Sequence, residues 1–183
     1  MKYVSEDLMI EHEGILLGLT VLKKMADMVR ESGSVDTNDI SELIGFLRLF
    51  ADKCHHGKEE GLLFPAMEKA GIPVERGPVG QMLLEHNEGR KYLADMELSV
   101  ERGALEETRF VQAAESYVGL MKAHIGKENT ILFPLGNKAI PLEEQEHLLK
   151  RFESFEEEII GKGTHEKMHE LLFELESKYL TAK

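Results

Sequence analysis

Cysteine is nearly absent from this sequence, and that absence excludes several kinds of site. The chain has 183 residues and one cysteine, Cys54, so no internal disulfide can form. Paired cysteines are also the usual ligands of iron–sulfur clusters and of Cys-rich zinc sites, and both are therefore disfavoured. A reducing, cytoplasmic compartment is the default expectation for such a chain.

Long apolar runs and an excess of positive charge are missing as well. No stretch approaches the ~20 apolar residues that span a bilayer, and the N-terminus "MKYVSEDLMIEHEG" turns acidic where a signal peptide would become apolar. A formal net charge of -12 disfavours binding to nucleic acid or to an anionic membrane. We therefore expect small molecules, cations or other proteins as partners, and the sequence singles out no particular protein partner.

Between the few glycines and prolines, apolar residues recur with the 3.6-residue period of helices. The expected fold class is all-α: an antiparallel up-and-down four-helix bundle with two extra C-terminal helices. The length suits one domain, 1–183, with the bundle at about 5–136 and the extension at about 141–181. Pro65 and Pro134, late in the second and fourth helices, predict a kink or an early stop.

One phrase occurs twice in the chain. Residues 54–65 read "CHHGKEEGLLFP" and residues 123–134 read "AHIGKENTILFP". With His55 set on His124 (124 − 55 = 69), seven of the eleven positions from each histidine to its proline are identical. A fainter echo, "LMIEHE" at 8–13 and "MLLEHN" at 82–87, aligns His12 with His86. The sequence thus indicates a duplicated helical hairpin.

Each copy of the phrase places a histidine four residues before a glutamate. Four residues are slightly more than one helical turn, so the two side chains share a face, and here that face carries the apolar stripe. The single histidines of the first and third helices lie on apolar stripes too. Four histidines and two glutamates are therefore predicted to face one core: His12, His55, Glu59, His86, His124 and Glu128.

Burying two carboxylates without compensation is costly, and a metal supplies the missing charge. Two divalent ions bridged by both carboxylates, with two imidazoles on each ion, would satisfy every group. Mixed nitrogen and oxygen ligands suit iron, manganese or zinc rather than calcium. Of the adjacent histidines we expect His55 to be the ligand, because His56 and Glu60 are turned about 100° toward a wetter face.

The segments "EHEGIL", "HGKEEGLLFP", "EHNEGR" and "HIGKENTILFP" resemble those of the hemerythrin-like (HHE cation-binding) family. The resemblance implies a non-haem di-iron centre, with two iron ions (Fe2+/Fe3+) joined by an oxo, hydroxo or water bridge. It also implies that Glu59 and Glu128 are bridging carboxylates and that His12, His55, His86 and His124 are terminal ligands.

Oxygen-carrying members of that family have a further histidine where this chain has Arg90. The four-His, two-Glu set is more similar to the di-iron proteins that respond to nitric oxide and oxidative stress and repair iron–sulfur clusters. The resemblance therefore implies binding of, or reaction with, O2, peroxide or nitric oxide, in sensing, scavenging or cluster repair. The alternative is a metal-stabilised iron or zinc module for storage or structure, without redox chemistry.

Three further features compete with this interpretation. "HEKMH", residues 165–169, fits the His-Glu-x-x-His pattern of zinc metalloproteases but offers no third ligand. A solvated helix face, or a tail packed over the mouth of the bundle, is favoured instead. "EQEH" and "EKMH" fit the Glu-x-x-His pattern of ferritin-like proteins but lie outside the four long helices, so we treat them as accidental. Cys54 is expected to be a buried small side chain.

Overall fold

The computed structural model describes residues 3–33, 35–101, 103–161 and 163–181. These residues are almost entirely helical, which confirms the all-α prediction. A pair of two-residue antiparallel strands, β1 (Val100–Glu101) and β2 (Ala104–Leu105), was not expected. No helix within the described ranges combines the length and the apolar character that a bilayer span requires.

The first hairpin consists of α1 and a second, composite rod. α1 stops at Gly33, whose φ of 66° is a left-handed conformation that glycine adopts readily. The rod begins where the Asp36 side chain accepts a hydrogen bond from the backbone N–H of Asn38, at 2.9 Å. The elements are α1 (Val4–Ser32), α2 (Thr37–Phe46), η1 (Leu47–His56), η2 (Glu59–Leu63) and α3 (Phe64–Lys69).

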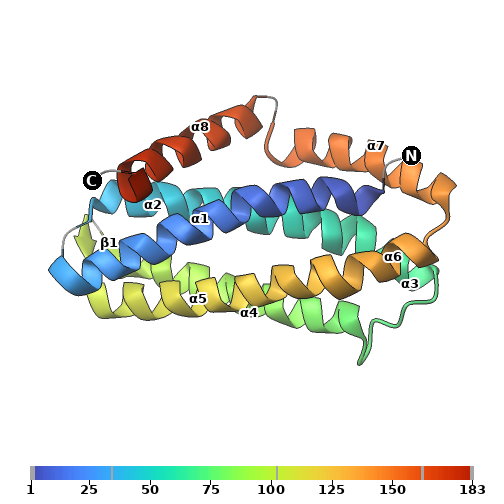
Figure 1. The fold of residues 1–183 in the computed structure, drawn as a ribbon, viewed down its shortest axis with the longest axis horizontal. Coiled ribbons are helices and arrows are strands. Elements are labelled where there is room, and N and C mark those ends of the chain that lie inside the picture. Colours follow the sequence, from blue (N-terminus) through green and yellow to red (C-terminus); the bar gives the residue numbers. More distant parts are fainter. Residues whose placement is uncertain (1–2, 34, 102, 162, 182–183) are drawn as a thin grey trace.

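The second hairpin repeats this plan, and the short β1–β2 pair connects its two rods. Pro78 occupies the first turn of α4, where its missing N–H costs no hydrogen bond. α5 packs against both α4 and α1, so the two hairpins lie side by side (Figure 1). The elements are α4 (Pro78–Ser99), α5 (Glu107–Lys127), η3 (Glu128–Leu132) and α6 (Phe133–Ala139).

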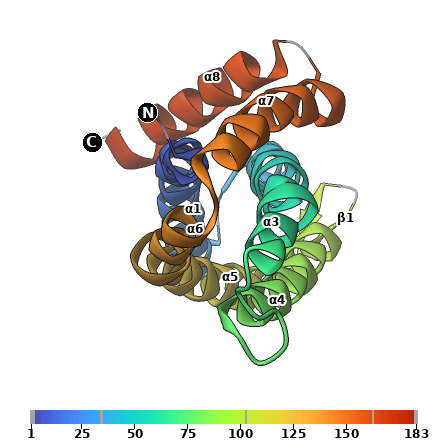
Figure 2. The same cartoon turned by 90° about the vertical axis from the view of Figure 1, so that its right-hand side faces the viewer.

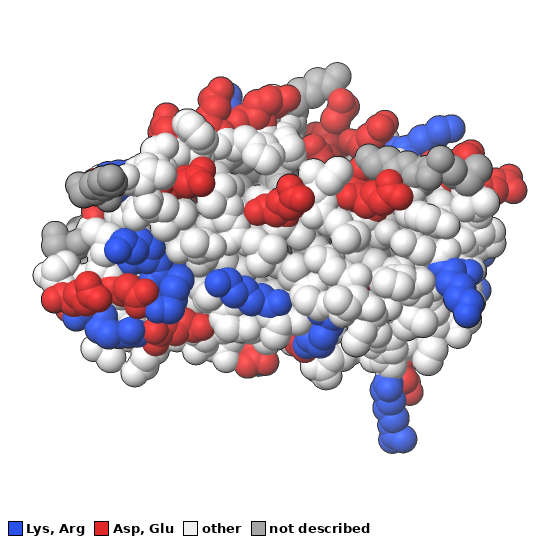
Figure 3. Space-filling view, viewed as in Figure 1, with Lys and Arg blue, Asp and Glu red and all other residues white. Residues whose placement is uncertain are grey.

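Three C-terminal elements, α7 (Leu142–Ile159), α8 (Thr164–Glu176) and the π-helical η4 (Ser177–Thr181), cover one side of the hairpins. Viewed end-on, the four rods surround a common axis and the extension lies across α1 and the second rod (Figure 2). Acidic side chains gather along the edge that α7 and α8 form (Figure 3).

Each hairpin has a short π-helical segment that ends just before a proline. η2 ends at Leu63 and η3 at Leu132, and a short α-helix with proline in its first turn then follows each. Proline has no N–H and its ring clashes with the carbonyl four residues earlier, which a wider i→i+5 turn relieves. The chain therefore accommodates Pro65 and Pro134 with π-helical segments, where a kink or an early stop was expected.

The hydrophobic core has two parts. One is centred on residues such as Leu19, Phe46 and Met121, and the other on residues such as Leu8, Phe64 and Phe133, with Leu148 and Phe152 of α7 joining the second. A layer of buried histidines and glutamates belongs to neither apolar cluster. Burying that polar layer costs folding free energy unless its groups find partners, so the layer is the candidate functional site.

Candidate metal centre

The structure brings all six predicted residues together in the interior. Each is at most 1% exposed. α1, α4 and α5 contribute one histidine each, whereas the composite rod of the first hairpin contributes a histidine and a glutamate, and η3 contributes the other glutamate. In order along the chain they are His12, His55, Glu59, His86, His124 and Glu128.

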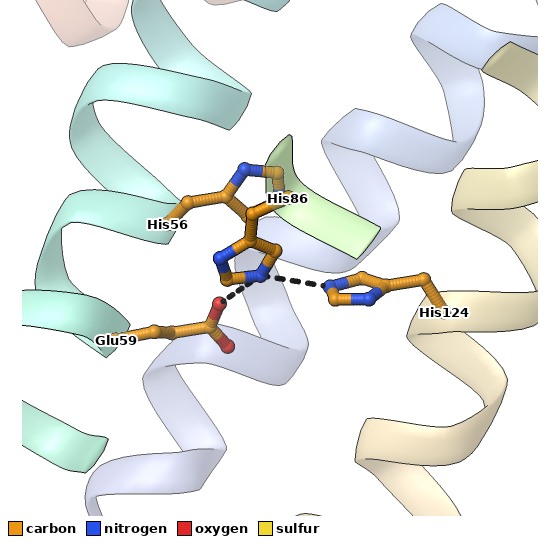
Figure 4. A group of neighbouring side chains, drawn as sticks. All are labelled: His56, Glu59, His86 and His124. Atoms are coloured by element: carbon orange, nitrogen blue, oxygen red, sulfur yellow. Dashed lines mark hydrogen bonds and ion pairs between the residues drawn. The ribbon is translucent and has the colours of Figure 1, made fainter. Parts of the chain in front are cut away.

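Their ligand atoms form two groups, within each of which all atoms lie within 4.8 Å of one another. Glu59 belongs to both groups. Figure 4 shows the second group, in which the rings of His86 and His124 and the carboxylate of Glu59 converge. The first group is His12, His55, Glu59 and Glu128, and the second is His56, Glu59, His86 and His124.

Both carboxylates lie between the two groups. One oxygen of Glu59 is 3.7 Å from His55 Nε2 and the other is 3.4 Å from His86 Nε2. Glu128 repeats the arrangement, with one oxygen 3.2 Å from His12 Nε2 and the other 3.1 Å from His124 Nε2. Each carboxylate thus turns one oxygen toward each pair of imidazoles, as a bridging ligand between two ions requires.

The expectation for His56 was wrong, because its side chain is buried in the second group and not on a wetter face. Its ring stacks on His86, with centroids 3.9 Å apart. The cause is that η1 is enclosed on more than one side, because α1, α4 and α7 all pack against it. His55 lies against α1, where Glu11 accepts from it, and His56 lies against His86 of α4, so both adjacent side chains are buried.

Each of the four predicted histidines is held from outside through Nδ1. The acceptors are Asn129 Oδ1 for His12 at 2.9 Å, Glu11 Oε2 for His55 at 2.8 Å, Glu60 Oε1 for His86 at 2.7 Å and Glu85 Oε2 for His124 at 2.9 Å. Such a partner fixes the ring and leaves Nε2 facing inward, as in metal sites generally. His56 differs, because neither of its ring nitrogens has a hydrogen-bond partner in the described part of the chain.

The lysine of the duplicated phrase has the same role in both copies. Lys58 forms an ion pair with Glu11, the acceptor of His55, and Lys127 forms one with Glu85, the acceptor of His124. Burial raises the pKa of Glu11, but the hydrogen bond from His55 and the charge of Lys58 outweigh it and hold that pKa at about 2. The carboxylate is therefore ionised and ready to accept the Nδ1 proton.

The phenylalanine of the phrase is duplicated in its role as well. Phe64 stacks on His86 at a centroid distance of 5.9 Å, and Phe133 stacks on His12 at 5.6 Å. Each hairpin therefore supplies the ring that covers a histidine of the other. These contacts limit the rotation of both imidazoles and keep bulk water away from them.

Several buried atoms of the site have no hydrogen-bond partner among the residues that the structure describes. They are Nε2 of His12 and His55, both ring nitrogens of His56, and both carboxylate oxygens of Glu59 and Glu128. Native interiors rarely leave so many polar atoms unpaired in one place. Cations bound between them would pair with the carboxylate oxygens and with one nitrogen of each imidazole, so these residues fit a metal centre.

Protons compensate the carboxylates when no ion is bound. Burial lowers the pKa of His86, but its contacts with Glu59 and Glu60 outweigh that effect and raise it to about 9. Burial likewise lowers the pKa of His12, and Glu128 raises it more. Because a ligating imidazole is neutral, a metal must displace these protons, and its affinity should rise with pH.

Arg90 is committed to other partners. Its Nε donates to Asp52 Oδ1 at 2.6 Å, and its Nη2 donates at 2.7 Å to Glu60 Oε1, the same oxygen that faces His86 Nδ1. The oxygen carriers of the resembled family have a histidine ligand at this position. In this chain Arg90 instead holds Glu60, the carboxylate that accepts from Nδ1 of His86.

The competing motifs lie apart from this centre. His165 and His169 contact each other and Phe50, but neither belongs to a metal-competent group within the described residues. Cys54 is 1% exposed, and burial raises the pKa of its thiol to about 12, so it is not an activated nucleophile.

Fold and site together define a helical protein whose interior holds a cluster of histidine and glutamate side chains that could bind a cation. The family model of the hemerythrin HHE cation binding domain matches residues 4–136, and the chain belongs to this family. Comparisons with curated proteins and with solved structures gave no significant match. The matched region includes every residue of the two groups and ends before α7.

Proposed function

We propose that the chain is a non-haem di-iron protein whose centre binds or reacts with O2, peroxide or nitric oxide. The observation that carries the proposal is the position of Glu59 and Glu128, each with one oxygen toward either pair of imidazoles. Membership of a cation-binding family supports it independently. Sensing, scavenging and iron–sulfur cluster repair are the processes that such reactivity would serve.

In this proposal His12 and His55 would hold one ion, His86 and His124 would hold the other, and Glu59 and Glu128 would bridge them. This set keeps the two imidazoles on each ion that the sequence predicted. His56 is a further candidate ligand for the second ion. With His56 bound, the second ion would have three imidazoles and the first two, so the ion at His12 and His55 would keep more positions for an exogenous ligand.

Bound iron would supply one-electron redox chemistry and an open coordination position. The chain supplies the surroundings. Glu11, Glu60, Glu85 and Asn129 orient the imidazoles, while burial and the stacked rings of Phe64 and Phe133 exclude bulk water. An interior in which every ligand is at most 2% exposed favours small diatomic molecules or peroxide over larger substrates.

A titration separates this function from a storage or structural module. Ferrous protein, prepared without oxygen, is expected to develop a new visible absorption band on addition of nitric oxide, saturating at about one ligand per chain because one ion is more open. The His165→Ala variant is the matched control, since it removes a histidine outside both groups, and it should behave as the wild type. A ferrous protein with full metal content and an unchanged spectrum would instead indicate storage without redox chemistry.

A further inference from the structure

The C-terminal helix α7 lies outside the family match but packs against the metal-site rod at η1 and η2. Gly57, the glycine of the duplicated phrase, leaves room for the Phe155 ring of α7 to pack against this rod. A Cβ atom added at Gly57 would lie 2.8 Å from Cζ of Phe155, and one at Gly61 would lie 4.0 Å from the same ring. A larger side chain at position 57 would therefore clash with the Phe155 ring.

This close packing brings a carboxylate of α7 to the outer shell of the site. Glu156 Oε2 is 3.2 Å from Nζ of Lys58, whose side chain is only 2% exposed. Lys58 also pairs with Glu11 and lies 5.7 Å from the ring centre of Phe152. Glu11 in turn accepts the Nδ1 proton of His55. A continuous chain of polar contacts thus runs from α7 to a proposed ligand.

The second half of the molecule has no equivalent of this contact. Gly126, which aligns with Gly57, would place a Cβ with nothing within 4 Å. Lys127, which aligns with Lys58, is 37% exposed at its side chain, and Glu85 is the acidic partner recorded for it within the described ranges. The Lys58–Glu11 pair and the Lys127–Glu85 pair therefore match in their contacts with histidine but differ in one respect: α7 covers the first pair and contributes a carboxylate to it.

We propose that α7 is part of the metal centre and that Glu156 is a positioning residue for His55, acting through Lys58 and Glu11. The inference rests on the proposed function, because it assigns a role toward the bound metal. Without Glu156, the buried Lys58 ammonium loses one of its two acceptors and shifts, and the Glu11 carboxylate that orients His55 loses its fixed position. Partners in the outer shell of a metal typically change its affinity by about 10–100-fold.

The test uses full-length protein loaded with zinc, which is diamagnetic, and labelled with 15N-histidine. Glu156→Gln is compared with Glu158→Gln, which removes the same charge from an exposed position of α7. Glu156→Gln is expected to speed chelator-driven release of one zinc ion about tenfold, to leave the other unchanged, and to speed solvent exchange of the His55 Nδ1 proton. The His124 Nδ1 proton is the internal control and should not change.

Three results are distinguishable: two would overturn the inference, and one would overturn the proposed function. If the wild type holds two zinc ions and Glu156→Gln matches Glu158→Gln in zinc release and in His55 exchange, then α7 is only packed against the site. If the wild type takes up no zinc and no iron, the proposed function itself fails. A general loosening of the fold by Glu156→Gln would also count against the proposal, and it would be recognised because His124 exchange would then rise together with that of His55.

Discussion

Glu59→Ala is expected to lower the iron content of anaerobically reconstituted protein from about two ions per chain to well below one. Glu59 is the residue common to both groups and has one oxygen toward each. In the proposed centre its loss would remove an anionic ligand from both ions at once, whereas loss of a histidine would remove a neutral ligand from one. His124→Ala should therefore cost less metal than Glu59→Ala.

Metal analysis together with circular dichroism tests this expectation. Glu68→Ala is the control, because Glu68 is exposed on the same composite rod, and it should retain the wild-type metal content. Glu59→Gln keeps the volume of the side chain and guards against a loss of metal caused by misfolding. Two ions per chain in folded Glu59→Gln and Glu59→Ala proteins would refute a bridging role.

Removal of the metal is expected to destabilise the protein strongly. Free metal at about 1,000 times its Kd raises the free energy of unfolding by about 4 kcal/mol per independently bound ion, or about 10 °C in the melting temperature for a chain of this size. Without metal, the interior holds two carboxylates that only protonated histidines compensate. Thermal unfolding of the ferrous protein with and without chelator measures the difference.

The effect of metal removal should be larger at pH 9 than at pH 6. The folded pKa of His86 is about 9, above its ordinary value of 6.5. Its protonation therefore stabilises the metal-free protein fully below about 6.5, and this contribution disappears as the pH rises through about 9. Bound metal competes with the same proton, so its own contribution rises over that interval. Equal melting temperatures with and without chelator at both pH values would contradict a structural role for the metal.

The helices, and the burial of the six predicted residues in one interior, could be predicted from the sequence because a 3.6-residue period fixes which side chains share a face. The duplication strengthened this inference, since a constant offset of 69 set His55 on His124 and Glu59 on Glu128. The structure assigns parallel contacts to other members of the phrase: Lys58 and Lys127 hold outer carboxylates, and Phe64 and Phe133 cover histidines.

The burial of His56, the acceptors of the histidines and the contact of α7 could not be predicted, because the apolar period does not show how the helices pack against one another. His56 faces the interior because α4 packs against η1 and brings His86 onto its ring, and the period of one helix does not say which neighbours cover its other faces. The acceptors Glu11 and Glu85 pair with histidines of another helix, so their identity depends on how far one rod is shifted along its neighbour. The "EH" pairs at 11–12 and 85–86 were a signal that could have suggested them. The contact of Glu156 with Lys58 is set by the packing of α7 and had no such signal.

We propose that two metal ions lie between the hairpins, with Glu59 and Glu128 joining them. Anomalous scattering at the iron edge, from crystals of protein reconstituted with ferrous iron, would locate these ions. Two peaks are expected about 3.5–4 Å apart, one adjoining Nε2 of His12 and His55 and the other adjoining Nε2 of His86 and His124. A single peak, or peaks at His165 and His169 with none at the buried glutamates, would contradict it.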